Sequence, residues 1–112
     1  MARIKGTRAD DNLVGTTGRD RIDGRQGDDH LWGNGGNDTF VFQNVPHKNF
    51  GNDVIHDFNA GDNIVFNHYD DWSALQAGSD VVISVDPGRS GDDYTVTVLG
   101  VNIDTVLAGI IG

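Results

Sequence analysis

Large apolar residues recur at every ninth position over the first third of the chain. They are Leu13, Ile22, Leu31 and Phe40. Nine residues make two and a half turns of an α-helix, so successive apolar side chains would point to opposite sides of a helix. The period instead predicts units of turn followed by a short strand, in which the recurring side chain faces inward and its neighbours face outward.

Polar residues keep the same period. Three units, 15–23, 24–32 and 33–41, each have Gly at the first and fourth positions, Asp at the sixth and a large apolar residue at the eighth. A weaker unit, 6–14, precedes them in register, with Ala9 in place of the second Gly. The sixth positions hold Asp11, Asp20, Asp29 and Asp38. We expect two units to form one coil of a flattened spiral, so that alternate units stack as parallel strands.

Stacked coils of this kind need a cation. One buried apolar side chain per unit does not offset the cost of ordering nine residues, and stacking brings the aspartate rows together at like charge. Gly-rich turns with short carboxylates offer only oxygen ligands, of which Ca²⁺ takes about six to eight. The chain has no Cys, the ligand that a soft metal prefers. The sequence therefore predicts calcium between the turns.

The units resemble the RTX (repeats-in-toxin, hemolysin-type) nonapeptide, Gly-Gly-x-Gly-x-Asp-x-apolar-x, over residues 6–41. The second Gly of that pattern is replaced by Thr7, Thr16, Arg25 and Asn34. We expect this position to be the least constrained, if only its carbonyl is used. The fold that the resemblance implies is all-β: a right-handed parallel β-roll, a β-helix-like solenoid, with a C-terminal antiparallel β-hairpin cap.

The resemblance also implies Ca²⁺ ions held between units two apart, by main-chain carbonyls and by the aspartate of each turn. One predicted site comprises Thr7, Ala9, Asp11, Gly24, Gln26 and Asp29. A second comprises Thr16, Gly18, Asp20, Gly33, Gly35 and Asp38. Candidate ligands for further ions are Gly27, Gly36, Asp53, Asp57 and Asp62. We therefore expect two to four calcium ions.

The rest of the chain is expected to complete the roll, so that residues 1–112 form a single RTX module with repeats in 6–41 and the last coils and cap in 42–112. The segments 51–58 and 60–66 return to the Gly-x-Asp-x-apolar pattern after a loop. Later segments predict one helical turn over 70–76, with Trp72 and Leu75 inward, and a hairpin of strands 81–85 and 94–99.

Composition narrows the classes of function. The net charge is −9 and all 17 acidic residues are Asp, which disfavours nucleic acid as a partner. The chain shows neither an N-terminal signal peptide nor an apolar run long enough to span a bilayer. The four histidines, His30, His47, His56 and His68, are scattered, and no nucleophile motif is present. We expect no catalytic residues, and a chain that is not an enzyme by itself.

Two functions stay open. The resemblance implies a calcium-binding module at the C-terminus of a protein exported by type I secretion, where it serves folding and secretion. The module would be extracellular. The parent protein would have a catalytic domain upstream of it. The alternative is an accessory module that binds an acidic polysaccharide such as alginate, as the R-modules of alginate epimerases resemble this chain. Its contacts would be Arg19, Arg21, Arg25 and Trp32. Otherwise the arginines are counter-charges to the aspartates, and Trp32 is covered by the C-terminal half.

Overall fold

The computed structural model describes residues 2–7, 10–25, 28–43, 52–67, 71–86 and 94–111. The strands in these ranges are β1 (Ala2–Lys5), β2 (Asn12–Val14), β3 (Asp20–Asp23), β4 (His30–Trp32), β5 (Thr39–Gln43), β6 (Asn52–Ile55), β7 (Asn63–Asn67), β8 (Asp71–Ala77), β9 (Asp80–Asp86), β10 (Tyr94–Val98) and β11 (Ile110–Ile111). The helix is α1 (Ile103–Gly109).

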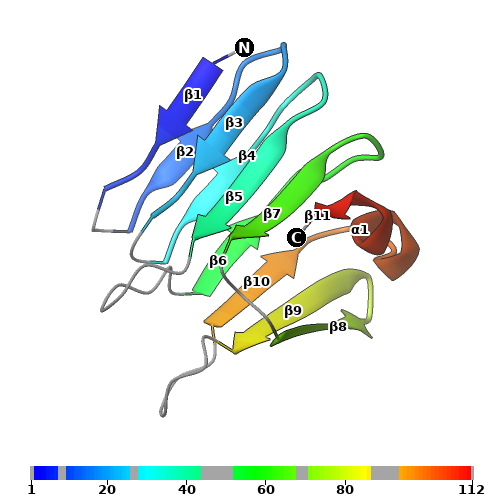
Figure 1. Ribbon diagram of the computed structural model, residues 1–112. Coiled ribbons are helices and arrows are strands. Elements are labelled where there is room, and N and C mark those ends of the chain that lie inside the picture. The colour runs from blue at the N-terminus through cyan, green and yellow to red at the C-terminus, as the bar shows by residue number, and fades with distance from the viewer. Residues whose placement is uncertain are drawn as a thin grey trace.

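The strands alternate between two facing sheets (Figure 1). Sheet A has the order β1-β3-β5-β7-β11, and sheet B has the order β2-β4-β6-β10-β9-β8. Sheet A is parallel throughout, and sheet B is parallel from β2 to β10. One strand of each sheet and the two turns beside it make one coil. The predicted all-β parallel β-roll is therefore confirmed.

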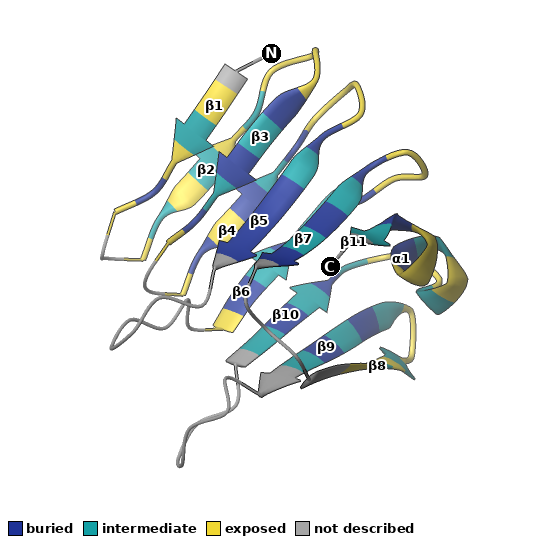
Figure 2. Cartoon of the chain, viewed as in Figure 1, coloured by how far each residue is buried: buried dark blue, intermediate teal, exposed yellow. Residues whose placement is uncertain are grey.

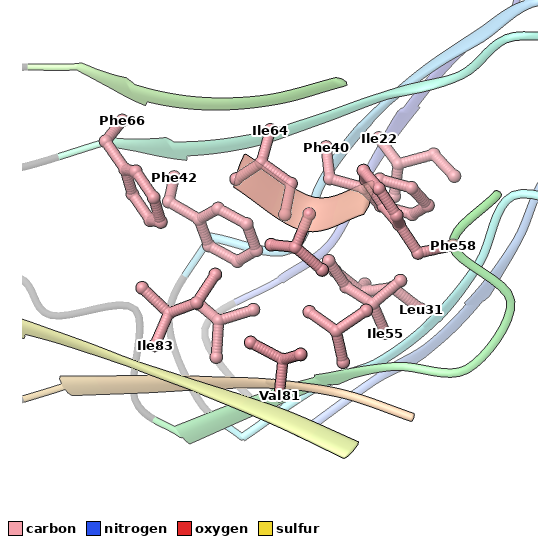
Figure 3. Close-up of a cluster of buried hydrophobic side chains, with 13 residues drawn as sticks. Ile22, Leu31, Phe40, Phe42, Ile55, Phe58, Ile64, Phe66, Val81 and Ile83 are labelled. Atoms are coloured by element: carbon pink, nitrogen blue, oxygen red, sulfur yellow. The ribbon is translucent and has the colours of Figure 1, made fainter. Parts of the chain in front are cut away.

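The core lies between the sheets and is built from columns of apolar residues in register. Sheet A aligns Ile4, Ile22, Phe40, Ile64 and Ile110, and sheet B aligns Leu13, Leu31, Ile55 and Val98. The middle members of both columns are fully buried (Figure 2). Phe42, Phe58 and Phe66 fill the same interior (Figure 3). The inward position of the recurring apolar residue is thus confirmed, and the columns are half-buried at their ends, at Ile4 and Leu13 in the first coil and at Ile110 in the last.

The last third of the chain continues both sheets. The predicted hairpin forms between β9 and β10, with Val96 and Val98 fully buried on one face. The residues between these strands, 87–93, lie outside the described part. β10 then pairs in parallel with β6, and β11 with β7, so they take the places of the next coil. The cap is therefore larger than a hairpin.

The predicted helical turn over 70–76 is wrong. Asp71–Ala77 is the strand β8, which pairs antiparallel with β9 along its whole length. Leu75 points outward and is 68% exposed. The side chain of Trp72 lies outside the described part. Seven cross-strand partners and a two-residue turn at Gly78 and Ser79 outweigh the weak local preference for helix.

Candidate metal centre

The repeat turns form two stacks, one along each edge of the roll (Figure 1). On one edge the described ends of the turns 6–11 and 24–29 lie on one another, since the Gly6 N–H donates to the carbonyl of Asp23 at 2.8 Å. On the other edge, turns 15–20, 33–38 and 57–62 follow one another. The Gly15 N–H donates to the Trp32 carbonyl at 2.7 Å, and the Asn63 N–H donates to the Asp38 carbonyl at 2.8 Å.

The aspartates of stacked turns are joined in two ladders. On one edge the Asp11 N–H donates to Asp29 Oδ1 at 2.8 Å, and the Asp29 N–H donates to Asp53 Oδ1 at 2.9 Å. On the other edge Asp20 donates to Asp38 at 2.9 Å and Asp38 to Asp62 at 2.8 Å, in the same way. The structure thus brings together the aspartates of units two apart. The partners are first 18 and then 24 residues apart, so the later coils contain a six-residue insertion.

The second oxygen of three of these carboxylates has no partner. Asp29 Oδ2, Asp38 Oδ2 and Asp53 Oδ2 are buried and accept no hydrogen bond, and each residue is at most 1% exposed. Burying a carboxylate oxygen without a partner is costly. A hard cation is the partner that this set of oxygens fits. The residues present therefore suit calcium.

The electrostatics of the same carboxyl groups agree with this fit. Burial raises the pKa of Asp29 and of Asp38 to about 6, although a main-chain hydrogen bond opposes the rise and neighbouring aspartates add to it. Burial raises the pKa of Asp53 further, to about 9. Asp62 shifts in the same direction for the same reason. Without a cation, the fold disfavours the charged form of each group.

Main-chain carbonyl oxygens, and in places aspartate oxygens, approach the glycines of the turns so closely that a side chain there would clash. A Cβ on Gly15 would lie 2.6 Å from both the Gly33 carbonyl oxygen and Asp20 Oδ2. A Cβ on Gly6 would clash with the Gly24 carbonyl oxygen, and a Cβ on Gly36 would lie 2.7 Å from that of Gly18. The turns therefore converge carbonyl and carboxylate oxygens on a small space. Among the described residues no three carboxylates or imidazoles form a metal cluster, so carbonyls would have to complete any site.

The predicted ligand sets can be placed residue by residue. All six residues of the second set lie in the stacked turns 15–20 and 33–38. From the first set, Thr7, Asp11, Gly24 and Asp29 lie in turns 6–11 and 24–29, while Ala9, Gln26 and the further candidate Gly27 fall outside the described part. Of the other candidates, Gly36 and Asp53 lie in the stacks. Asp57 accepts main-chain hydrogen bonds: its two oxygens accept the N–H groups of Gly33 and Asn34, both at 2.7 Å.

The second position of the repeat is constrained, so the expectation for it was wrong. Arg25 and Asn34 have φ of 61° and 62°, the left-handed region that favours glycine. Thr7 and Thr16 each donate hydrogen bonds from the main-chain N–H and the hydroxyl to the aspartate four residues later. The Thr16 N–H donates to Asp20 Oδ2 at 2.7 Å and its hydroxyl to Asp20 Oδ1 at 2.8 Å. Sequence reasoning had assigned this position only a carbonyl, yet Thr four residues before Asp was a visible signal.

The four predicted polysaccharide contacts do not share one face. Arg21 lies on β3 in sheet A, whereas Trp32 lies on β4 in sheet B. Arg19 and Arg25 lie in turns on opposite edges of the roll. The Trp32 ring stacks on His56, with centroids 4.2 Å apart and planes at 11°. One partner of Trp32 is therefore supplied by the next coil.

Comparisons with known proteins agree with this geometry. Residues 5–40 match the RTX calcium-binding nonapeptide repeat in four copies. The extracellular lipase LipA from Serratia marcescens has a similar structure, with a TM-score of 0.70 and 25% identity over 98% of this chain and 20% of the lipase. A subunit of the mannuronan C5-epimerase from Azotobacter vinelandii matches with a TM-score of 0.53 and 22% identity, over 95% of this chain and 80% of that one.

The two structural matches cover different shares of the matched proteins. This chain spans about a fifth of the length of the lipase, so the likeness concerns one part of that enzyme. The epimerase subunit shares the fold. No curated protein sequence matches this chain. The family match identifies the repeats, and the two similar structures share the fold that the repeats build.

Proposed function

We propose that this chain, whose residues 5–40 are four RTX calcium-binding nonapeptide repeats in a parallel β-roll, is a non-catalytic folding module of an exported protein. Ca²⁺ outside the cell would drive its folding. The observation that carries the proposal is the set of three buried aspartate oxygens without a partner. At low Ca²⁺ the stacked aspartates within each ladder repel one another, so the chain stays extended until ions bind.

The residues that would hold the ions follow from the stacks. Asp11 with Asp29, and Asp20 with Asp38, would each hold one ion together with nearby carbonyl oxygens. Asp29 with Asp53, and Asp38 with Asp62, would add further ions, giving two to four. Calcium supplies positive charge between the turns and leaves the coils free to stack. Each ion that binds only the folded chain stabilises it by RT ln(1 + [Ca²⁺]/Kd), so several sites with Kd on the order of 10⁻⁴–10⁻³ M can decide folding together.

Circular dichroism tests the proposal directly. We expect the β-sheet signal to be lost in chelator and restored by millimolar Ca²⁺, because the buried carboxylates need a cation. Asp38→Asn should raise the Ca²⁺ concentration at the folding midpoint several-fold. Asp104→Asn, which removes an exposed carboxylate on α1, should leave the midpoint unchanged. A spectrum and a native-mass metal count that are both indifferent to Ca²⁺ would overturn the proposal.

The parent protein and its location belong to the same proposal. Both similar structures come from enzymes, and one of them is an extracellular lipase, so we place this module beside a catalytic domain in an exported protein. None of the helices in the described part is long and apolar enough to cross a membrane. In this arrangement the module would fold after export, and the chemistry would be done by the neighbouring domain.

A second candidate is the binding of an acidic polysaccharide to the outer face of sheet A. Arg3 and Arg21 are direct neighbours there, on the paired strands β1 and β3. One of the similar structures is a subunit of a mannuronan C5-epimerase. Titration of the Ca²⁺-loaded chain with oligouronates should give heat that Arg21→Gln abolishes and Arg25→Gln, off this face, retains. Absence of heat would leave the folding role alone.

A further inference from the structure

Two histidines meet on the outer face of sheet B, next in sequence to Asp29 and Asp57. His30 lies on β4, and His56 directly follows β6, the neighbouring parallel strand. His30 Nδ1 and His56 Nε2 are 2.8 Å apart. His30 is exposed and His56 is half-buried, so solvent reaches the pair. The period of the repeat does not explain this contact, because neither residue belongs to the glycine–aspartate pattern.

We propose that His30 and His56 form a site for a transition-metal dication such as Zn²⁺ or Ni²⁺, separate from the calcium sites. Imidazole nitrogens suit these ions, whereas Ca²⁺ prefers oxygen, so the two classes of ion would not compete. The two rings supply two ligands, and water would complete the coordination shell. Among the described residues no third carboxylate or imidazole joins them.

The separation of the nitrogens fits two ligands of one ion. With metal–nitrogen bonds of about 2.0–2.1 Å, two nitrogens at ~90° lie ~2.9 Å apart, and at the tetrahedral angle they lie ~3.3 Å apart. From the observed 2.8 Å the two nitrogens would have to separate slightly, and both rings would have to turn so that their lone pairs converge on the ion. The proton between the rings would move, through water, to the outer nitrogen of the ring that carries it. Both neutral imidazoles then offer a lone pair to the ion.

Trp32 holds one ligand in place and reports on the site. Its ring stacks on His56 at 4.2 Å and lies 6.1 Å from the ring of His30. The three rings thus form one group on the outer face of sheet B, from β4 and from the residue after β6. A paramagnetic ion bound to the histidines would lie beside the indole and quench its fluorescence.

The test is a Ni²⁺ titration of the full chain at saturating Ca²⁺, followed by calorimetry and by tryptophan fluorescence. We expect one ion per chain and quenching of Trp32 in a Trp72→Phe background. His30→Gln and His56→Gln should each weaken binding on the order of a hundredfold, because one imidazole cannot chelate. His47→Gln and His68→Gln serve as matched controls that keep the affinity. Zn²⁺ should displace Ni²⁺ and restore the fluorescence.

A second measurement does not depend on the variants. In spectra of the unmodified Ca²⁺-loaded chain, Ni²⁺ should broaden the amide signals of residues 30–32 and 54–56 first. Broadening that starts at the ladder of Asp20, Asp38 and Asp62 on the other edge, or equal affinity of all four histidine variants, would overturn the inference. Ca²⁺-dependent folding is read separately by circular dichroism, so failure of the histidine site is distinguishable from failure of the proposed function.

Discussion

Arg25 has a side chain where the backbone of the repeat favours glycine. Its φ is 61°, its N–H donates to Asp23 Oδ1 at 3.0 Å, and its side chain is exposed. A residue with a Cβ in the left-handed region costs roughly 1–2 kcal/mol. We therefore expect Arg25→Gly to raise the free energy of unfolding by about 1 kcal/mol in saturating Ca²⁺, measured by urea denaturation.

Two variants separate backbone strain at Arg25 from charge. Arg25→Gln keeps the Cβ and removes the charge, so it should not reproduce the gain. Asn34→Gly should gain less, because Asn tolerates the left-handed region and its Nδ2 donates to the Gly15 carbonyl at 2.9 Å. Equal stability of Arg25→Gly and the original chain would contradict the argument from φ.

At the scale of the residue, the sequence predicts which aspartates meet. It does not predict which of their oxygens lack a hydrogen-bond partner. The pairing of Asp20 with Asp38 follows from a nine-residue period and two strands per coil. The missing partner of Asp38 Oδ2 depends on the side-chain conformation and on burial by the coils on both sides, which no spacing contains. The left-handed backbone at Asn34 was not predicted for a different reason. The second position of the repeat had been assigned only a carbonyl ligand, so its φ was not considered.

At the scale of the element, the strands of the repeats could be predicted and β8 could not. Asp71–Ala77 contains Ala, Leu and Gln, which are good helix formers, so local preference gave the wrong answer. The available signal was the turn Gly78–Ser79, typical of a two-residue hairpin, in which Gly78 has φ of 66°. Pairing with β9 then fixes the strand, as tertiary contacts commonly do in sheets.

The side chain of Gln76 on β8 links this strand to the segment that leads into α1. Gln76 Nε2 donates to the carbonyls of Asp80 at 2.8 Å and Val101 at 3.2 Å, and Gln76 Oε1 accepts the Ile103 N–H at 2.7 Å. The helix α1 begins at Ile103, so Gln76 satisfies an amide that the helix itself cannot. Asn102 caps the same end by accepting the Asp104 N–H at 2.8 Å. The contacts of Gln76 with Val101 and Ile103 join residues far apart in sequence, so no local pattern predicts these two.

At the scale of the whole molecule, the roll stacks acidic turns in a chain of net charge −9. The apolar columns hold the two sheets together, and the aspartate ladders run along both edges. The period of the sequence predicted this division between core and edges. The C-terminal closure, in which β10 and β11 occupy the next coil, could not be predicted because it has no repeat.

The aspartate ladders give the Ca²⁺-free chain a pH dependence whose sign can be worked out. Burial raises the pKa of Asp29 and Asp38 to about 6 and that of Asp53 to about 9, against about 4 in an unfolded chain. The folded chain therefore binds more protons than the unfolded chain above pH ~4, so its stability falls as the pH rises. In chelator, we expect the β-sheet signal to increase when the pH is lowered from about 7.5 to about 5.

Calcium should favour the charged form of the same carboxyl groups over the protonated form, because the ion binds carboxylates only when they are charged. The apparent Kd of the folded chain for Ca²⁺ should therefore rise on acidification, even as the Ca²⁺-free chain becomes more stable. Asp53→Asn separates the two effects. Its amide oxygen can still accept the Asp29 N–H without a charge to bury, so this variant should be more stable in chelator near pH 7. If the Ca²⁺-free chain lost structure between pH 7.5 and 5, burial of these carboxylates would not be what keeps it unfolded.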